Sequence, residues 1–216
     1  MKNLMFLFLL FSSYNLLSQK NPENSLGVWY MYGGNFQLSQ NWTLKSLSHF
    51  RMFDFTNNLQ QYLFRVGANL KLNKEISFTG GYAYLNTDHT FQENGGKIDE
   101  HRIYEDFNVK HKISKLKLAH RLRVEHRFLT GDILHWVRYQ LGLSYPLTKK
   151  INTFIFDEIF FHFPNETYAQ NWVGGGLTYK IANSISLKTG YMYISDKNMN
   201  LNRIQIGVIF NTQITK

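Results

Sequence analysis

The chain has 216 residues, no cysteine and a formal net charge of +9. The absence of cysteine excludes disulfide bonds and thiolate metal sites, so non-covalent contacts alone have to hold the fold together. The basic residues are spread along the chain and form no basic stripe on one domain, which excludes nucleic acid as an expected partner.

The first 18 residues have the pattern of a removable signal peptide. Met1-Lys2-Asn3 supplies a positive start, Leu4 to Phe11 an apolar run, and Ser12 to Ser18 a region for processing. A retained anchor is disfavoured because a helix that spans a membrane needs about 20 apolar residues. We therefore predict a signal peptide at 1–18, export, and a single mature domain at 19–216.

Apolar and polar residues alternate through almost all of the remaining chain. Segment 116–128 shows this best: Leu122 and Val124 share one face, while Arg123 and Glu125 share the other. Such a strand suits lipid on one side and water or a polar filling on the other. This alternation is the signature of a transmembrane β-barrel.

Alternation and turn residues together predict about eleven strands. They cover 26–38, 42–54, 59–72, 76–86, 101–113, 115–128, 133–146, 151–163, 169–180, 184–194 and 200–210. The predicted fold class is all-β, an antiparallel transmembrane β-barrel of about 10–12 strands. Bacterial single-chain barrels normally have an even number of strands, so one of the eleven is expected to be wrong. The weakest is 26–38, where Gly33-Gly34 could kink the strand, form a turn, or send the segment across the lumen.

The predicted connections differ in length at the two ends of the barrel. Segments 87–100, 129–132, 162–168 and 195–199 are mostly longer than the turns between the other strands. Short turns belong on the periplasmic side, so the last strand is expected to run inward. Aromatic residues near both sets of ends, such as Trp42 and Tyr191, predict two interfacial girdles. A soluble sandwich would also alternate, but its strands are typically about 5–6 residues long.

The ionisable residues of the predicted strands lie mostly on the inward face, where basic groups outnumber acids. We predict a lumen ion network of Arg51, Arg65, Arg102, Asp106, Arg121, Arg123, Glu125, Arg127, Arg138, Glu158 and Arg203. In a filled barrel, the three acids pair with the arginines across neighbouring strands. In an open barrel, the surplus of positive charge favours anions. The filled interior is favoured, because arginine–carboxylate ladders are the usual way in which a narrow barrel satisfies its interior.

Several strings in the chain resemble one family of exported proteins. These are Glu100 to Tyr104, His120 to Phe128, Arg138-Tyr139 through Ser144 to Leu147, Asp157 to Phe160, and Gly190-Tyr191. In this order and spacing they are similar to the domain of unknown function 2490 family, which consists of outer-membrane barrels of Gram-negative bacteria. The resemblance covers about Gly27 to Phe210 and implies this fold and location, but no established activity.

Two positions depart from the pattern of that family. Leu47 stands where a polar, often acidic, residue is expected, and Trp172 stands where an arginine is usual. The resemblance implies that both departures remove members from the inner ion network.

The alternative function is catalysis, in place of a passage or a structural role. Barrel enzymes that act on lipids place a serine, a histidine and an acid at the outer rim. His126, His135, His162 and Ser195 are predicted near that end, so a lipid hydrolase or acyltransferase at the outer leaflet is the alternative. No Gly-x-Ser-x-Gly turn accompanies these residues.

A metal site is not expected either. The candidate ligands His111, His120, His126 and His135 are spread along the chain and are assigned to mixed faces of their strands.

The sequence therefore predicts an outer-membrane β-barrel without catalytic residues, cofactor or metal. It is expected to be either a filled structural or partner-binding barrel or a narrow, anion-preferring passage for small solutes. The expected partners are outer-membrane lipid, the barrel-assembly machinery and, if the lumen is open, small anions.

Overall fold

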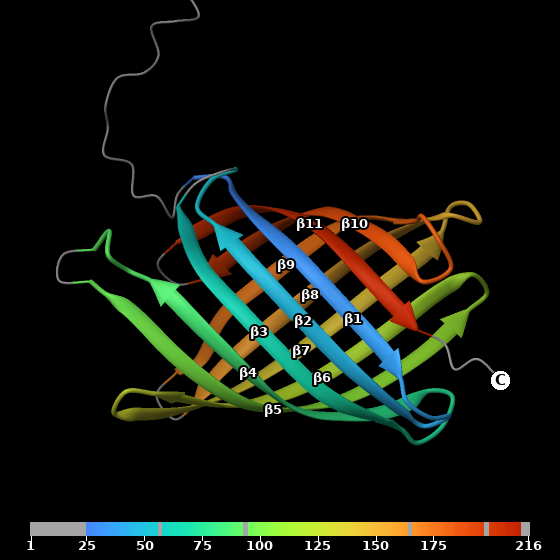
Figure 1. Cartoon of the computed structure of the whole chain (residues 1–216), viewed down its shortest axis with the longest axis horizontal. Coiled ribbons are helices and arrows are strands. Elements are labelled where there is room, and N and C mark those ends of the chain that lie inside the picture. Colours follow the sequence, from blue (N-terminus) through green and yellow to red (C-terminus); the bar gives the residue numbers. More distant parts are fainter. Residues whose placement is uncertain (1–24, 56–57, 93–94, 164–165, 197–198, 213–216) are drawn as a thin grey trace, which may run out of the picture.

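The computed structural model describes residues 25–55, 58–92, 95–163, 166–196 and 199–212. These residues form eleven β-strands that close into one barrel (Figure 1). The strands are β1 (Gly27–Gln37), β2 (Trp42–Met52), β3 (Leu59–Lys71), β4 (Ile76–Asp88), β5 (Lys97–Ile113), β6 (Leu116–Leu129), β7 (Asp132–Pro146), β8 (Ile151–Phe163), β9 (Glu166–Lys180), β10 (Ile185–Asp196) and β11 (Asn200–Thr212). No helix in the described ranges is long and apolar enough to cross a membrane. The predicted signal peptide at 1–18 lies outside the described residues.

The barrel closes at a parallel seam between β1 and β11. All other neighbouring strands of the described barrel are antiparallel and consecutive in the chain. With an odd number of strands, the first and the last strand run in the same direction, as the blue and red arrows of Figure 1 show. The expectation that one of the eleven predicted strands was wrong is therefore itself wrong. Segment 26–38 forms a regular strand that closes the barrel and does not cross the lumen.

Side chains add to the backbone pairing at this seam, where a parallel ladder is slightly less stable than an antiparallel one. The side-chain amide of Asn35 donates to the amide oxygen of Asn211 at 2.9 Å. The backbone N–H of Gln37 donates to the hydroxyl of Thr212 at 3.1 Å. These bonds lie near the ends of the two strands and hold them in register.

Several observed strands extend further into the connections than predicted, whereas β1, β2 and β3 are slightly shorter. β5 begins at Lys97 and β9 at Glu166, within the segments 87–100 and 162–168 that were predicted as loops. The longest connection between strands is consequently 89–96. We call the end of the barrel that holds 89–96 the loop end, and the opposite end, which holds 147–150, the turn end. β1 begins at the loop end and β11 finishes at the turn end.

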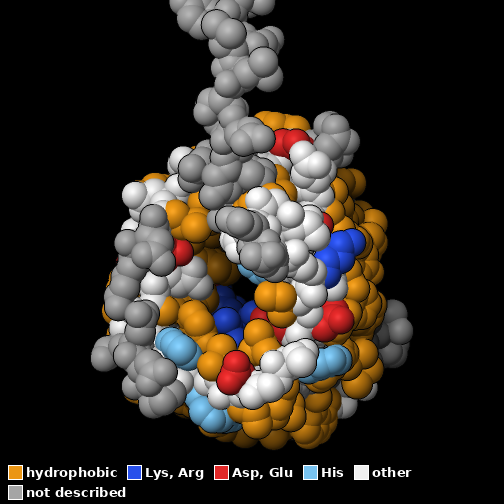
Figure 2. All heavy atoms as spheres, turned by 90° about the vertical axis from the view of Figure 1, so that its left-hand side faces the viewer, with side chains coloured by type: hydrophobic (Ala, Val, Ile, Leu, Met, Phe, Trp, Pro, Cys, Tyr) orange, Lys and Arg blue, Asp and Glu red, His pale blue; other side chains and the backbone are white. Residues whose placement is uncertain are grey.

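The outer wall of the barrel is broadly apolar. Phe64, Ile155 and Tyr191 are among many large hydrophobic residues with half or more of their surface exposed. Figure 2 shows these side chains as an orange covering around the barrel. The strands contain 11 to 17 residues, enough to cross a bilayer, which takes about 9–11 residues in a tilted strand. A wall of this kind suits lipid and not water.

Candidate functional site in the barrel lumen

The inward side chains leave a cavity of about 1450 Å³ inside the barrel. Its lining extends from Thr87 and His89 at the loop end to Lys74 and Glu75 at the turn end. Figure 2 looks into the loop end and shows a hollow mouth with basic side chains at depth. The interior is therefore only partly filled by its own side chains.

One side of the lumen, formed by β5 to β8, carries a connected set of ion pairs. We call this set the ion ladder. Its members are Glu100, Arg102, Asp106, Arg121, Arg123, Glu125, Arg127, Arg138 and Glu158. Alternation places every second residue of a strand in the lumen, and register then brings opposite charges on neighbouring strands within reach.

Glu125 is the centre of the ion ladder. Its carboxylate lies 2.6 Å from a guanidinium nitrogen of Arg127, 2.8 Å from Arg138, 3.3 Å from Arg102 and 3.6 Å from Arg123. Only 2% of the Glu125 side chain is exposed. One buried carboxylate is thus shared by four cations. Each of them also contacts a second carboxylate, which is Glu100, Asp106 or Glu158.

Two further carboxylates fix the flanks of the ion ladder. Asp106 accepts two hydrogen bonds from Arg123, at 2.6 and 2.8 Å. Glu158 accepts hydrogen bonds from Arg121 at 2.7 Å and from the Nε of Arg138 at 2.9 Å. The bidentate pair with Asp106 fixes the plane of the Arg123 guanidinium, and Glu158 connects Arg121 to Arg138.

The remaining wall, formed mainly by β9 to β11 and β1 to β4, carries two apolar clusters between its polar side chains. We call it the apolar wall. Its members are Trp29, Met31, Leu47, Leu63, Ala83, Leu85, Trp172, Met192, Ile194 and Leu201, together with Phe156 and Phe160 from the adjoining β8. Trp172 packs against Phe160 with 4.6 Å between ring centroids and against Trp29 with 5.3 Å.

Basic side chains on this part of the lumen contact aromatic rings. The guanidinium carbon of Arg51 lies 3.9 Å from the ring centroid of Trp29, and Arg51 donates a hydrogen bond of 2.6 Å to Gln61. The guanidinium carbon of Arg65 lies 5.4 Å from the ring centroid of Tyr104. No carboxylate of the described residues forms an ion pair with Arg51 or Arg65. Both cations lie over aromatic rings, and Arg51 in addition donates to a side-chain oxygen.

Positive charge therefore prevails in the cavity. Among the described residues that line it, thirteen are lysine or arginine and four are glutamate. The carboxylates neutralise only part of the basic groups, and a low-dielectric wall concentrates the field of the remainder. The arrangement can attract and hold anions.

The family model described as "Protein of unknown function (DUF2490)" matches residues 26–205. The chain belongs to this family. No curated protein matches the chain.

The DUF2490 barrel resembles two solved outer-membrane structures. The NanC porin has a TM-score of 0.56 and 16% identity, with 87% of this chain and 100% of that chain covered. OmpTdeltaL8, a loop L8 deletion mutant of OmpT, an outer membrane protein of Vibrio cholerae, has a TM-score of 0.50 and 13% identity, with 81% of this chain covered. The DUF2490 chain spans 60% of the length of that OmpT chain. At these identities the likeness concerns the fold.

The structure places all eleven predicted site residues of the DUF2490 chain on the inward side. Eight of them belong to the ion ladder, whereas Arg51, Arg65 and Arg203 lie outside it. Arg203 is fully buried near the seam, where it donates hydrogen bonds of 2.9 Å to the backbone oxygens of Ser25 and Asn202.

Sequence reasoning missed one member of the ion ladder, Glu100. Its carboxylate lies 2.6 Å from Arg102 and 3.6 Å from Arg127. The predicted strand began at residue 101, so Glu100 was assigned to a loop. The alternation of Glu100, Arg102, Tyr104 and Asp106 is the signal that would have extended the strand.

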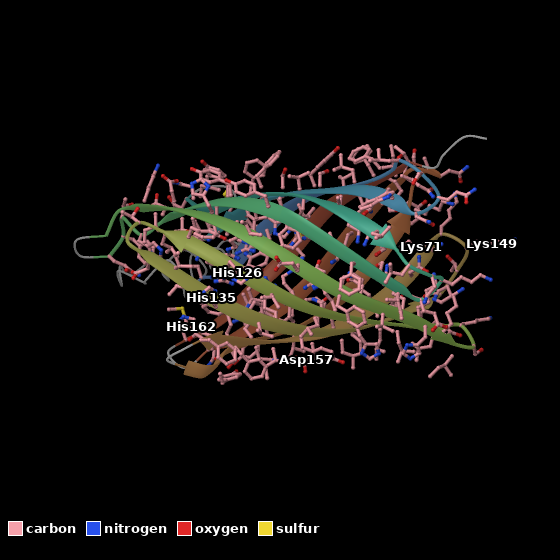
Figure 3. The ribbon with its side chains drawn as sticks, turned by 90° about the horizontal axis from the view of Figure 1, so that it is seen from below. Lys71, His126, His135, Lys149, Asp157 and His162 are labelled. Carbon is pink, nitrogen blue, oxygen red and sulfur yellow. The ribbon has the colours of Figure 1, made fainter. Side chains whose placement is uncertain are left out.

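The prediction that the four histidines lie on mixed faces is wrong. His111, His120, His126 and His135 all occupy the outward phase of β5, β6 or β7. Each turn resets the phase of the next strand, so odd and even numbers do not carry across a hairpin. The Nδ1 atoms of His126 and His135 lie 2.8 Å apart on neighbouring strands (Figure 3).

The other residues of the alternative enzyme are not brought together. His162 belongs to the inward phase of β8 and stacks on Trp136, with ring centroids 5.1 Å apart. Ser195 lies on β10, three strands away from β7 in the barrel. In the described part of the chain, no three or more histidines, cysteines or acids are grouped as metal ligands. The absence of catalysis stays a prediction.

Proposed function

We propose that this DUF2490 barrel lies in the outer membrane and acts as a narrow, anion-preferring passage for small solutes, without catalysis. The observation that carries the proposal is the cavity of about 1450 Å³, whose lining includes residues from both ends of the barrel. A barrel that served only as a structural element would need no such continuous space. The apolar outer wall and the porin-like fold support the location.

The charge of the lining supports the preference for anions. Lysine and arginine prevail among the lining residues, and Arg51 and Arg65 have no carboxylate partner among the described residues. A fixed positive potential in a narrow, low-dielectric lumen raises the local concentration of anions and lowers that of cations. The ion ladder narrows one side of the lumen, so the passage is suited to small solutes.

Single-channel recording of the refolded protein in planar bilayers tests this proposal. We expect small, stable current steps and, under a KCl gradient, a reversal potential that corresponds to a preference for chloride. The preference should weaken as the salt concentration rises, because the Debye length shrinks to about 3 Å at 1 M. Absence of conductance above background would indicate a filled structural or partner-binding barrel, and a preference for potassium would contradict the proposal.

Two glycines provide a matched pair of variants for assigning the current to the lumen. Gly142 faces the cavity, and a Cβ added there would lie no closer than 3.7 Å to any neighbouring atom. Gly80 faces outward, with no neighbouring atom within 4 Å of an added Cβ. Gly142→Phe should lower the conductance, whereas Gly80→Phe should leave it unchanged. Equal conductance of the two variants would show that current does not cross this cavity.

A further inference from the structure

A group of four basic side chains converges in the lumen outside the ion ladder. We call it the cation ring; its members are Lys45 on β2, Arg65 on β3, Lys110 on β5 and Lys188 on β10. None of the four forms an ion pair with an acid of the described residues. Arg65, Lys110 and Lys188 line the cavity. The ammonium group of Lys45 instead donates a hydrogen bond of 3.5 Å to the hydroxyl of Thr79.

The members of the cation ring come from opposite sides of the barrel. Around the closed barrel, β10 is five strands from β5 in one direction and six in the other, so Lys188 stands across the lumen from Lys110. The charges of Arg65 and Lys110 both act on Lys45. The charge of Arg121, a member of the ion ladder, acts on both Lys45 and Lys188. The cation ring is therefore gathered at one level of the lumen.

The acids close to the cation ring are already engaged by arginines. Asp106 accepts hydrogen bonds of 2.6 and 2.8 Å from Arg123. Glu158 accepts hydrogen bonds of 2.7 Å from Arg121 and 2.9 Å from Arg138. Like charges that lie close together disfavour one another. The positive charge that gathers at this level is thus left for an anion from outside the chain.

Small side chains leave space beside the cation ring. Lys110 lies in register with Ala119 on β6, and Ala119 with Gly142 on β7. On the far side of the lumen, Lys188 lies in register with Gly207 on β11. All three small residues line the cavity. A solute in the cavity can therefore reach the ammonium groups of Lys110 and Lys188.

The residue types of the cation ring differ from those of the ion ladder. Every cation of the ion ladder is an arginine, whose planar fork matches a planar carboxylate. Three of the four members of the cation ring are lysines, whose ammonium groups act as point charges with three donors each. Donors that approach from opposite sides suit an anion whose oxygens point in several directions. A phosphate group has such oxygens and close to two negative charges, so it fits this level better than a carboxylate does.

We propose that the cation ring is a binding site for a phosphate group, carried by inorganic phosphate or by a small phosphate ester. Arg65, Lys110 and Lys188 are the donors, and Lys45 adds a further positive charge beside them. As the solute class of the passage, this assignment rests on the function proposed for the barrel. Binding at the site does not require flow through the lumen, so binding and conductance can be measured separately.

Isothermal titration calorimetry of the refolded protein with sodium phosphate at low ionic strength tests the site without any current. At about pH 7.5, where a phosphate group carries close to two charges, we expect saturable binding. Sulfate should compete, and chloride at the same concentration should compete far less, because it carries a single charge. Glycerol 3-phosphate is titrated in parallel: binding of either ligand supports the site, and the tighter of the two identifies the source of the phosphate group. Absence of saturable binding for both ligands, or equal competition by chloride and sulfate, would overturn the proposal.

Single lysine substitutions assign the binding to the cation ring. Lys110→Gln and Lys188→Gln should each weaken phosphate binding about tenfold, since each removes a hydrogen bond from a charged donor. Lys110 is exposed in the lumen, so its substitution leaves the fold intact. Lys149→Gln is the matched control: it removes the same charge, but Lys149 lies in the connection 147–150 at the turn end (Figure 3) and should keep the affinity of wild type. Equal affinities of the three variants would show that phosphate does not bind at the cation ring.

Conductance in the same buffer separates this proposal from the function on which it rests. Phosphate binding by a protein that conducts no ions would support the site and contradict the passage. Chloride-selective current from a protein that binds neither phosphate nor glycerol 3-phosphate would support the passage and overturn the site.

Discussion

The two sides of the lumen accommodate basic side chains in different ways. On β5 to β8, arginines of the ion ladder are paired with buried carboxylates, and Glu125 alone contacts four of them. On the remaining wall, Arg51 and Arg65 lie over the rings of Trp29 and Tyr104 without a carboxylate partner in the described chain. The first arrangement keeps opposite charges locally balanced, whereas the second leaves positive charge available to a solute. We infer that the ion ladder serves mainly structure and that the cations outside it serve selectivity.

This difference also separates the energetic roles of the two sides. A network of buried ion pairs adds little net stability over apolar packing, but it is sensitive to the loss of a single member, because the remaining charges stay buried without a partner. An apolar wall loses stability in proportion to the surface and volume that are removed. Substitutions on the two sides should therefore lower the free energy of unfolding by different amounts.

The largest effect is expected from Glu125→Gln. The substitution keeps the shape of the side chain but removes the charge shared by Arg102, Arg127 and Arg138. We expect the free energy of unfolding to fall by about 3–5 kcal/mol, the usual cost of removing one partner from a buried ion pair, because the three carboxylates that remain then have to balance the five arginines of the ion ladder. Urea unfolding in detergent or lipid vesicles, followed by tryptophan fluorescence, measures this change.

Glu100→Gln is the matched control for this variant. Glu100 contacts only Arg102 and Arg127 within the ion ladder, and both of them also contact Glu125. Its removal should cost clearly less than the removal of Glu125. Similar losses for both variants would show that the ladder has no centre and that its charges are screened by water.

A somewhat smaller effect is expected on the apolar wall from Trp172→Ala. This substitution removes the ring that contacts Phe160 and Trp29, at centroid distances of 4.6 and 5.3 Å. We expect a loss of about 3 kcal/mol, the lower end for truncation of a large aromatic residue, because the space left behind joins the cavity. Trp172→Phe should retain most of the stability in the same unfolding experiment. If Trp172→Ala and Trp172→Phe lower the free energy of unfolding equally, ring packing does not stabilise this wall.

The number of strands and the inward face of most of the ionisable residues could be predicted, because a two-residue period is imposed by the backbone itself. The ends of the strands could not, since the period does not show where a strand stops. The inward positions of Arg123, Glu125 and Arg138 follow from that period and were predicted. The parallel seam could not be predicted, since pairing of β1 with β11 depends on closure of the whole barrel and not on local pattern.

Two properties of the site also could not be predicted from the sequence. The four-fold sharing of Glu125 depends on the stagger between β5, β6 and β7, which sets the diagonal neighbours across strands. The open space in the lumen depends on strand number and on the rotamers of the arginines, and the alternating pattern is the same for a filled and an open barrel. The apolar wall was indicated only by Leu47 and Trp172, the two departures from the family pattern, and both belong to it.

The substitutions with the smallest expected effect on stability are those that change ion selectivity. They test most directly whether the two sides of the lumen have different roles. The double variant Arg51→Gln/Arg65→Gln removes two cations outside the ion ladder and should lower the chloride-to-potassium permeability ratio, by about twofold or more at low salt, where screening is weak. The double variant Asp106→Asn/Arg123→Gln removes one ladder pair without changing the net charge and should leave the ratio nearly unaltered. Reversal potentials in planar bilayers measure both. An equal fall of the ratio in the two variants would mean that individual ladder arginines also contact the permeating anion, and the division of roles between the two sides would have to be abandoned.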